Sequence, residues 1–565
     1  MQRTTLPSYR ALSRRLPPHA APHCALPAAF SFRTPGSRWS SSSSSSSENP
    51  QGSTSNSSPA SAPLAFAAGA AVSGALAWYL ASSPAPQTTG APGPIVFNDT
   101  YGSAEDFRRA IAELRTFFPE DEDAVSTDPA HLEEHGYSEN DYLPGSWPSV
   151  VVYPSSTEDV VKIVKTAVKY KMPVIPYSGA TSLEGHYRAP SVGGICVDMS
   201  KMDSIIEINE GNSDVVCQPG IRWMDLNATL AKKGIPLFFP LDPAPGATIG
   251  GMLSTGCSGT NAVRYGTAKA EWFLNATVVL PSGEVIKTRR RARKSSAGFD
   301  VTKLFIGAEG TLGIVTEVTL RLAPLLPTNV AVAQFPDIRS AASAVAEIVN
   351  TGVGIQCVEL VDVQFMKATN VYGQSSRKWP EKDSLFFKFQ GPTPRALKET
   401  AEVVKKVTQK HGSSGFVLAS SDKEAHDLWQ DRKNGLYSSI ALLPGSRAWS
   451  TDVCVPPSKL PDLVMQTTED LREHGILYTV LGHVGDGNFH TTLMFVNEDE
   501  ADNIHEAVRR MVHRAIALDG TCTGEHGVGI GKREYLYEEL GVNTVELMKT
   551  IKKTIDPHNL FNPGR

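Results

Sequence analysis

The chain has 565 residues, a hydrophobic content of 41%, a charged content of 20% and a formal net charge of -5 at pH 7. This length is enough for two or more domains with sizeable cores. The negative net charge argues against a nucleic-acid-binding protein, because such proteins need basic surfaces to neutralise phosphates. The seven cysteines are scattered, odd in number and without any C-x-x-C pair. This pattern argues against both a disulfide scaffold and a zinc–thiolate site.

Residues 1–47 have the composition of a mitochondrial transit peptide. They contain six arginines, no lysine and no acidic residue, and they end in the serine run 40–47. Transit peptides are rich in Arg and Ser and poor in acidic residues. A generic disordered tail is the alternative interpretation, but such tails usually mix both charge signs. We therefore predict a transit peptide over 1–47 and a disordered linker over 48–63.

Residues 64–82 predict a single transmembrane helix. The segment is uncharged over 19 residues, close to the ~20 that are needed to cross a bilayer, and Trp78 and Tyr79 suit the membrane–water interface. A buried helix is the alternative, but the flanking segments offer nothing to bury it. All nearby basic residues precede the segment, so the positive-inside rule leaves the N-terminus in the matrix and puts the catalytic body in the intermembrane space. With the transit peptide, this predicts the mitochondrial inner membrane. Removal of the helix by processing stays open.

The following residues lead into a strand–helix–strand unit. A Pro/Gly/Thr linker is predicted over 83–103, and an acidic, partly helical lead-in over 104–145. Val150–Tyr153 and Val174–Tyr177 are strand-like, and the apolar residues of 160–168 recur at helical spacing between them.

Three segments rich in glycine and hydroxyl residues lie in this region. They cover residues 176–185, 247–259 and 307–315. Nothing bulky keeps a phosphate away from the backbone N–H groups of such loops, although one such loop alone would be an ordinary turn. Together the three segments suggest a long, flat cofactor that carries a diphosphate. A Rossmann or P-loop site is disfavoured, because neither G-x-G-x-x-G behind the first strand nor G-x-x-x-x-G-K followed by Ser or Thr occurs.

The order P-x-S-G-A-T-S-L-E-G, then D-P-x-P-x-A-T-I-G-G, then G-A-E-G-T-L-G-I-V resembles the FAD-binding domain of the vanillyl-alcohol-oxidase/PCMH flavoenzymes. The resemblance implies an α+β fold with a two-lobed PCMH-type FAD-binding domain over 146–325. It also implies non-covalent FAD: His186 follows the first loop, but the family's covalent attachments use a different local pattern. The residues that the resemblance places against FAD are Pro176, Tyr177, Ser178, Gly179, Ala180, Thr181, Ser182, Leu183, Asp242, Ala247, Thr248, Gly250, Gly251, Ser254, Gly256, Gly259, Tyr265, Glu309, Gly310, Gly313, Ile314, Val315 and Asn562.

Residues 326–565 predict a cap domain of another kind. Helix-like 341–350, strand-like 385–389, helix-like 395–410 and strand-like 415–419 suggest a ferredoxin-like α+β arrangement that would hold the substrate. The resemblance adds that the C-terminal helical segment returns to the FAD-binding domain, where Asn562 reaches the cofactor.

Two histidines and a Glu-His pair are the candidates for chemistry. His483 and His490 flank a Gly-Asp-Gly-Asn turn, so the ends of adjacent strands can bring both imidazoles together. Glu525 and His526 follow in a glycine-flanked segment. Each histidine alone is more often a core or turn residue than a ligand. Together, two imidazoles and one carboxylate favour a catalytic type of metal site that leaves positions for water and substrate.

The pairing of H-x-G-D-G-N-x-H with G-E-H-G resembles the metal-dependent D-2-hydroxyacid dehydrogenases of this superfamily. The resemblance implies that His483, His490 and Glu525 are ligands of a divalent metal, and that His526 is the general base. Zinc is favoured, but imidazole and carboxylate ligands also accept manganese or iron. Arg432 stands at the family's W-x-x-R position and is implied to clamp the substrate carboxylate, since guanidinium grips two oxygens at once. A helix-surface arginine is the alternative.

The resemblance also bears on the substrate and the electron acceptor. Ser450 and Thr492 stand where D-2-hydroxyglutarate enzymes have lysine and asparagine. D-lactate is therefore the favoured substrate, D-2-hydroxyglutarate and glycolate are alternatives, and cytochrome c is the acceptor implied in the intermembrane space. A flavin-dependent transferase similar to alkylglycerone-phosphate synthase is a further alternative, which would not need the paired-histidine motif. A flavoprotein that only carries electrons is another alternative function.

Overall fold

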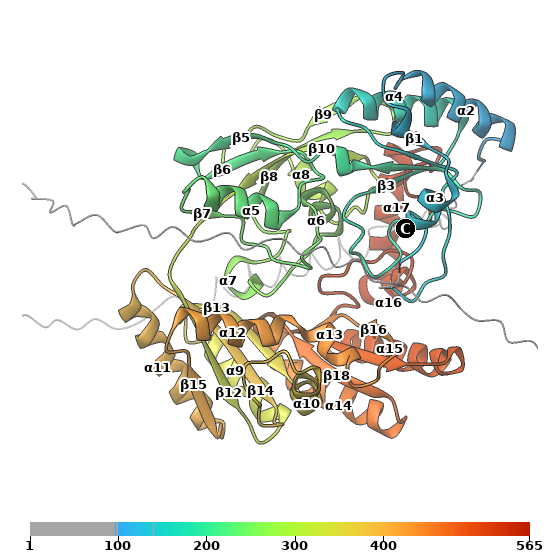
Figure 1. Ribbon diagram of the computed structural model, residues 1–565. Coiled ribbons are helices and arrows are strands. Elements are labelled where there is room, and N and C mark those ends of the chain that lie inside the picture. The colour runs from blue at the N-terminus through green and yellow to red at the C-terminus, as the bar shows by residue number, and fades with distance from the viewer. Residues whose placement is uncertain (1–96, 98–99, 139–140) are drawn as a thin grey trace, which may run out of the picture. The chain divides into compact units, whose positions relative to one another are not determined.

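The computed structural model describes residues 97, 100–138 and 141–565, all of which belong to one compact unit that spans residues 90–565 (Figure 1). The predicted transit peptide over 1–47, the linker over 48–63 and the transmembrane helix over 64–82 lie outside the described residues. Within the described part of the chain, no helix is both long and apolar enough to cross a membrane.

The first lobe of the predicted FAD-binding domain is built on a sheet of four strands in the order β1-β2-β4-β3, in which β2, β4 and β3 are parallel. The predicted strand–helix–strand unit is β2-α4-β3, and the apolar face of α4 is buried at Val160, Ile163, Val164 and Ala167. Ser156 caps this helix by accepting a hydrogen bond from the N–H of Asp159. The elements of the lobe are α2 (Ala104–Thr116), β1 (Val125–Ser126), α3 (Pro129–Glu134), β2 (Val150–Val152), α4 (Thr157–Tyr170), β3 (Val174–Tyr177) and β4 (Ile195–Asp198).

The second lobe is an antiparallel sheet in the order β5-β6-β10-β8-β9, and β7 and β11 form a separate two-stranded sheet. Apolar residues from the strands and from α5 and α6 make its core. The elements are β5 (Ile205–Asn209), β6 (Asp214–Cys217), α5 (Trp223–Lys232), β7 (Leu237–Phe238), α6 (Ile249–Thr255), α7 (Ala262–Tyr265), β8 (Phe273–Val279), β9 (Val285–Lys287), α8 (Val301–Phe305), β10 (Ile314–Arg321) and β11 (Ala323–Pro324).

The cap is built on a sheet of eight strands, which confirms the predicted α+β fold. Its first four strands stand in the order β15-β12-β14-β13, and the crossovers after β12 and β14 contain α9 and α11, as in a ferredoxin-like unit. The second half adds β18, β19, β16 and β17. The strands are β12 (Thr328–Gln334), β13 (Ile355–Val361), β14 (Ser384–Gln390), β15 (Gly415–Leu418), β16 (Arg447–Ser450), β17 (Val453–Cys454), β18 (Leu477–Gly482) and β19 (Asn488–Phe495).

Both faces of the cap sheet are covered, and successive residues of one strand enter different cores. Ala331 and Phe387 belong to the core beneath α9, α11, α14 and α15, whereas Val332 and Phe386 belong to the core beneath α10 and α12. This alternation follows from the two-residue period of a strand. The helices are α9 (Ile338–Val349), α10 (Val363–Tyr372), α11 (Pro394–Lys410), α12 (Asp422–Lys433), α13 (Gly435–Ile440), α14 (Leu460–Glu473) and α15 (Glu498–Ala517).

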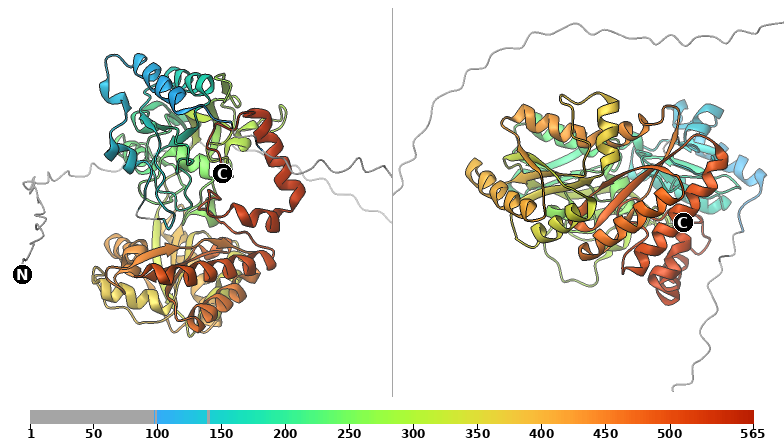
Figure 2. Two further views of the ribbon diagram at one scale, coloured as in Figure 1. Left: turned by 90° about the vertical axis from the view of Figure 1, so that its right-hand side faces the viewer. Right: turned by 90° about the horizontal axis from the view of Figure 1, so that it is seen from below.

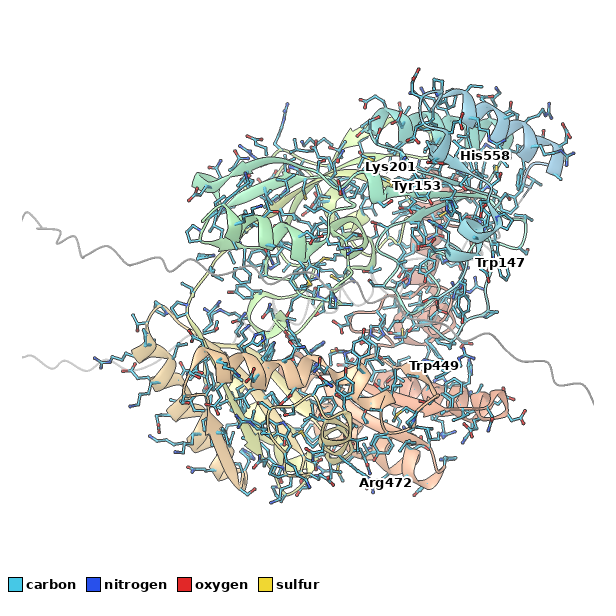
Figure 3. All side chains as sticks on the ribbon, viewed as in Figure 1. Trp147, Tyr153, Lys201, Trp449, Arg472 and His558 are labelled. Carbon is cyan, nitrogen blue, oxygen red and sulfur yellow. The ribbon has the colours of Figure 1, made fainter. Side chains whose placement is uncertain are left out.

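Segments from both ends of the described chain connect the cap to the FAD-binding domain. After α16 (Leu536–Leu540) and α17 (Val542–Ile555), drawn in red in Figure 2, Phe561 forms a parallel bridge to Val174 of β3 and enters the core of the first lobe. This confirms the predicted return of the C-terminal segment. At the other end, Tyr142 of the lead-in stacks on Trp449 of the cap, labelled in Figure 3, with ring centroids 3.5 Å apart.

Candidate functional site

All three glycine-rich segments line one cavity of about 640 Å³, and the cap closes its other side. All of the residues predicted to contact FAD line this cavity, except Gly256 and Tyr265. Gly256 instead ends α6 in a left-handed conformation, and the hydroxyl of Tyr265 donates a hydrogen bond to Gln390. The assignment of these two residues to FAD stays a prediction, since neither is among the residues that line the cavity.

The composition and backbone of the wall suit a large flat cofactor. A cavity of this size lies within the range of ligand sites, ~300–1,000 Å³. Ala180, Glu309 and Asn562 line it with positive φ, a conformation that non-glycine residues adopt at a cost and that clusters at functional sites. The buried Oδ1 of Asn562 has no hydrogen-bond partner among residues 141–565. The cavity thus combines small residues with an unused acceptor, as a flavin site would.

One hairpin supplies both histidines of the paired motif. β18 and β19 are antiparallel neighbours, with Leu481 opposite His490, and His483 directly follows β18. The rings of His483 and His490 lie 5.2 Å apart and nearly perpendicular. Gly487 has φ +81° in the turn, and a Cβ there would lie 1.9 Å from the carbonyl oxygen of Val455. The turn therefore needs glycine in order to place the two imidazoles at the cavity wall.

Glu525 lies between the two imidazoles. Its Oε1 is 3.1 Å from the Nε2 of His483 and 3.1 Å from the Nε2 of His490. The three ligand atoms lie within 4.8 Å of one another, and Glu525 Oε2 has no partner in the described part of the chain. Burial opposes ionisation of Glu525, but the two histidines outweigh it and hold the pKa of this carboxyl well below its ordinary value. Two imidazole nitrogens and one carboxylate fit a divalent cation of the catalytic type.

The other nitrogen of each imidazole is held by the cap. His483 Nδ1 lies 3.0 Å from both oxygens of Glu359, and His490 Nδ1 lies 2.8 Å from the carbonyl oxygen of Thr451. These acceptors favour a proton on each Nδ1, so that each Nε2 could offer its lone pair to a cation held beside Glu525. Such outer contacts are the usual means of orienting metal-binding histidines.

Arg432 lines the cavity from α12, but its guanidinium is already engaged. Its Nε donates a hydrogen bond to Glu359 Oε2 at 3.0 Å, and only 6% of the residue is exposed. It is therefore no helix-surface arginine. Glu359 is fully buried on β13 and connects Arg432 to His483. Glu359 is absent from the predicted site residues, although a glutamate inside the mostly apolar run 355–361 is itself a signal, since a buried charge needs a partner.

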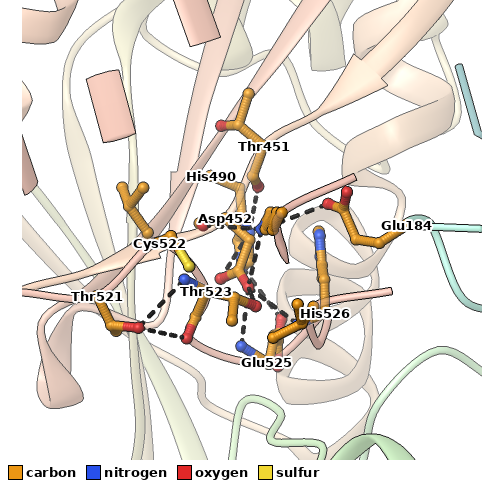
Figure 4. A network of polar contacts seen from close by, with 12 residues as sticks. Glu184, Thr451, Asp452, His490, Thr521, Cys522, Thr523, Glu525 and His526 are labelled. Carbon is orange, nitrogen blue, oxygen red and sulfur yellow. Dashed lines mark hydrogen bonds and ion pairs between the residues drawn. The ribbon is translucent and has the colours of Figure 1, made fainter. Parts of the chain in front are cut away.

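A third imidazole lies beside the pair on a loop that Asp452 holds (Figure 4). Asp452 Oδ2 accepts hydrogen bonds from the N–H groups of Glu525 and His526, both at 2.9 Å, and from the hydroxyl of Thr523. The ring of His526 stacks on that of His490 with centroids 5.2 Å apart. Burial lowers the pKa of His526 to about 4. The imidazole is therefore neutral at pH 7 and can accept a proton.

Ser450 and His186, two further positions that the sequence singles out, lie at the same wall. Ser450 and Thr492 face each other across β16 and β19, and Ser450 lines the cavity. His186 also lines it, with Nε2 3.1 Å from Glu309 Oε1. Asp486 belongs to the turn of the histidine hairpin, as expected.

Comparisons with known proteins agree with this architecture. Residues 148–289 match the family model described as FAD binding domain, and residues 327–565 match that described as FAD linked oxidases, C-terminal domain. The mitochondrial D-lactate dehydrogenase (cytochrome) of Arabidopsis thaliana is 43% identical, and the alignment covers 81% of this chain and 80% of that protein. The protein of the same name from Kluyveromyces lactis is 40% identical, with 82% of each chain covered.

A solved structure shares the fold at low sequence identity. The 4-ethylphenol oxidase from Gulosibacter chungangensis superposes with a TM-score of 0.68 and 19% identity, over 82% of this chain and 98% of that one. The sequence identity with the curated relatives is high enough to assign the family, and the alignments cover enough of both chains. The chain therefore belongs to the FAD-linked oxidases, in the branch that contains the mitochondrial D-lactate dehydrogenases (cytochrome).

Proposed function

We propose that the protein oxidises D-lactate to pyruvate with FAD and a divalent metal, and passes the electrons to cytochrome c. The observation that carries the proposal is the convergence of His483, His490, Glu525 and His526 at the wall of the cavity that the glycine-rich segments line. The names of the curated relatives support the reaction, the acceptor and a mitochondrial location.

FAD and the divalent metal would be held by different domains. The first- and second-lobe segments 176–183, 247–259 and 309–315, with Asn562, would hold the FAD, which supplies the acceptor for the hydrogen and two electrons of the substrate carbon. His483, His490 and Glu525 would hold the metal, with zinc favoured and manganese or iron as alternatives. The metal supplies a positive charge that lowers the pKa of a substrate hydroxyl.

The residues of the chain bind the substrate and move its proton. Arg432, oriented by Glu359, places its remaining N–H donors at the cavity for the lactate carboxylate. His526 takes the proton of the 2-hydroxyl, because its imidazole is neutral at pH 7 and its Nδ1 has no partner within residues 141–565. Asp452 holds the backbone of this residue and so fixes where the proton is received.

The substrate assignment depends on the wall beside the histidines. Ser450 lines the cavity and Thr492 lies opposite it on β19, and because both are uncharged, neither can form an ion pair with a second carboxylate. A small monoacid such as D-lactate is therefore preferred over D-2-hydroxyglutarate, while glycolate differs from lactate only by a methyl group.

The N-terminal residues belong to the proposal as well. A transit peptide over 1–47 and one helix over 64–82 would place the protein at the inner membrane, with residues 146–325 and 326–565 as FAD-binding and cap domains in the intermembrane space. The composition of 1–47 and the mitochondrial names of the relatives support this.

Anaerobic mixing of the purified protein with a panel of D- and L-2-hydroxy acids tests the reaction. We expect D-lactate to bleach the flavin absorbance fastest, D-2-hydroxyglutarate to be slower, and L-lactate to have no effect. His526→Ala should keep its bound FAD and lose reduction by D-lactate, while dithionite still bleaches it. Wild-type flavin that no 2-hydroxy acid reduces would exclude the dehydrogenase and favour the transferase.

A further inference from the structure

Glu309 lies in the third glycine-rich segment and lines the cavity. Its N–H donates to the carbonyl oxygen of Ser254 at 2.8 Å, and its own carbonyl oxygen accepts from the side chain of Asn562 at 2.7 Å. Its φ is +53°, a conformation that costs free energy for a residue with a side chain. The surrounding segments thus hold Glu309 in an unfavourable backbone conformation.

The side chain of Glu309 contacts the cap. Oε1 accepts a hydrogen bond from the N–H of Val528 at 2.7 Å, and Oε2 accepts one from the N–H of Gly529 at 2.9 Å. Burial opposes ionisation of Glu309, but His186 and these two N–H groups outweigh it and hold the pKa of the carboxyl below its ordinary value. The carboxylate is therefore ionised at pH 7, and its hydrogen bonds are of the stronger, charge-assisted kind.

Two carboxylates from different domains hold the same loop. Asp452, from the cap, accepts from the N–H groups of Glu525 and His526, and Glu309, from the FAD-binding domain, accepts from those of Val528 and Gly529. Gly527 lies between the two pairs with φ +82°, where a Cβ would lie 2.6 Å from His186 Nε2 and 2.8 Å from Glu309 Oε1. The loop packs directly against Glu309 and has no room for a side chain there.

We infer that Glu309 is a positioning residue, which ties the loop that carries Glu525 and His526 to the wall of the flavin cavity through its carboxylate. The inference rests on the proposed function, because it gives Glu309 a part in placing the proton acceptor relative to the flavin. It adds to the role expected from the sequence, since Glu309 lines the cavity and its carboxylate also holds the loop of the cap.

Glu309→Gln tests this inference with little change of size. An amide offers one oxygen for two adjacent N–H donors, and its own NH₂ group would face the other donor. We expect bound FAD and its dissociation constant to change by less than about threefold, while flavin reduction at saturating D-lactate slows roughly 10- to 100-fold, the effect of a small misplacement of catalytic groups. Hydrogen exchange in a peptide covering 523–531, followed by mass spectrometry, should become at least about tenfold faster.

Glu317→Gln is the matched control, because Glu317 lies in the same domain on β10 and pairs with Lys287 at the surface, 2.9 Å away. It should match the wild type in every measurement. If Glu309→Gln does not fold, Glu309→Asp keeps the charge but is one methylene shorter, and it should show the same faster exchange. Unchanged exchange in 523–531, or weaker FAD binding with an unchanged rate in the bound fraction, would overturn the inference. A wild type that D-lactate does not reduce would refute the proposed function alone, since the exchange measurement needs no substrate.

Discussion

The carboxylate of Glu359 should control metal retention, because it is the one acceptor in the described residues that contacts both Arg432 and His483. Glu359→Gln keeps the shape of the side chain but leaves one oxygen for two donors, the guanidinium of Arg432 and Nδ1 of His483. If the oxygen faces Arg432, the NH₂ group faces His483 Nδ1 and favours the tautomer with a proton on Nε2, which cannot bind a metal. If the oxygen faces His483, the NH₂ group faces the buried guanidinium of Arg432.

The magnitude follows from these contacts. Loss of an outer partner of a metal-binding histidine typically lowers metal affinity 10- to 100-fold, or about 1.4–2.8 kcal/mol at ~1.4 kcal/mol per factor of ten. We expect Glu359→Gln to lose its metal at a chelator concentration that is lower by this factor. Because Arg432 also loses an anionic partner, the KM for D-lactate should rise in the metal-loaded variant.

Metal content after dialysis against graded chelator, measured by elemental analysis, is the assay. Glu347→Gln is the matched control: Glu347 also bridges a cation and a histidine, Lys410 and His411, each at 2.8 Å, but on the surface of the cap. It should retain metal like the wild type. Equal metal retention in Glu359→Gln and Glu347→Gln would refute the assigned role of Glu359.

Three further changes test the base, the clamp and the core. Because burial lowers the pKa of His526 to about 4, the base is deprotonated above that pH. In stopped-flow experiments, the rate of flavin reduction should therefore fall only as the pH is lowered from 5 through 4. A fall of the rate near pH 6.5 would contradict this. Arg432→Lys keeps the charge but cannot make the paired contact with Glu359, so steady-state kinetics should give a KM for D-lactate that is raised roughly 10-fold, whereas Arg395→Lys, on an exposed helix face, should leave KM unchanged. Phe387→Ala removes a fully buried ring from the centre of the cap sheet and should cost about 3–5 kcal/mol of stability; Phe299→Ala, at a position that is 85% exposed, should stay within about 0.5 kcal/mol in the same thermal unfolding experiment.

The parts of the site that sequence reasoning places well are local in the chain. His483 and His490 are seven residues apart around a glycine turn, so strand pairing alone predicts that they meet. The helix over Thr157–Tyr170 follows in the same way from its 3.6-residue apolar spacing. In both cases the pattern and the contact that it produces lie in one stretch of sequence.

The parts that could not be predicted depend on distant segments. Glu359 lies 73 residues from Arg432 and 124 from His483, and nothing local indicates which cation a buried glutamate contacts. Gly256 was assigned to the cofactor because a glycine-rich motif does not distinguish a residue that ends a helix from one that faces a ligand. The contact of Tyr265 is equally hidden in the local sequence, since its hydroxyl donates to Gln390 of the cap.

The docking of the segment after α17 has a consequence for biosynthesis. Asn562 completes the flavin cavity by donating to the carbonyl oxygen of His186, which was translated 376 residues earlier. Domains generally fold in order as they leave the ribosome, but here the FAD-binding domain stays unfinished until the residues beyond the cap have been made. The complete wall can therefore meet flavin only after this last segment has been translated, and a chain that stops short of it lacks part of the cavity wall.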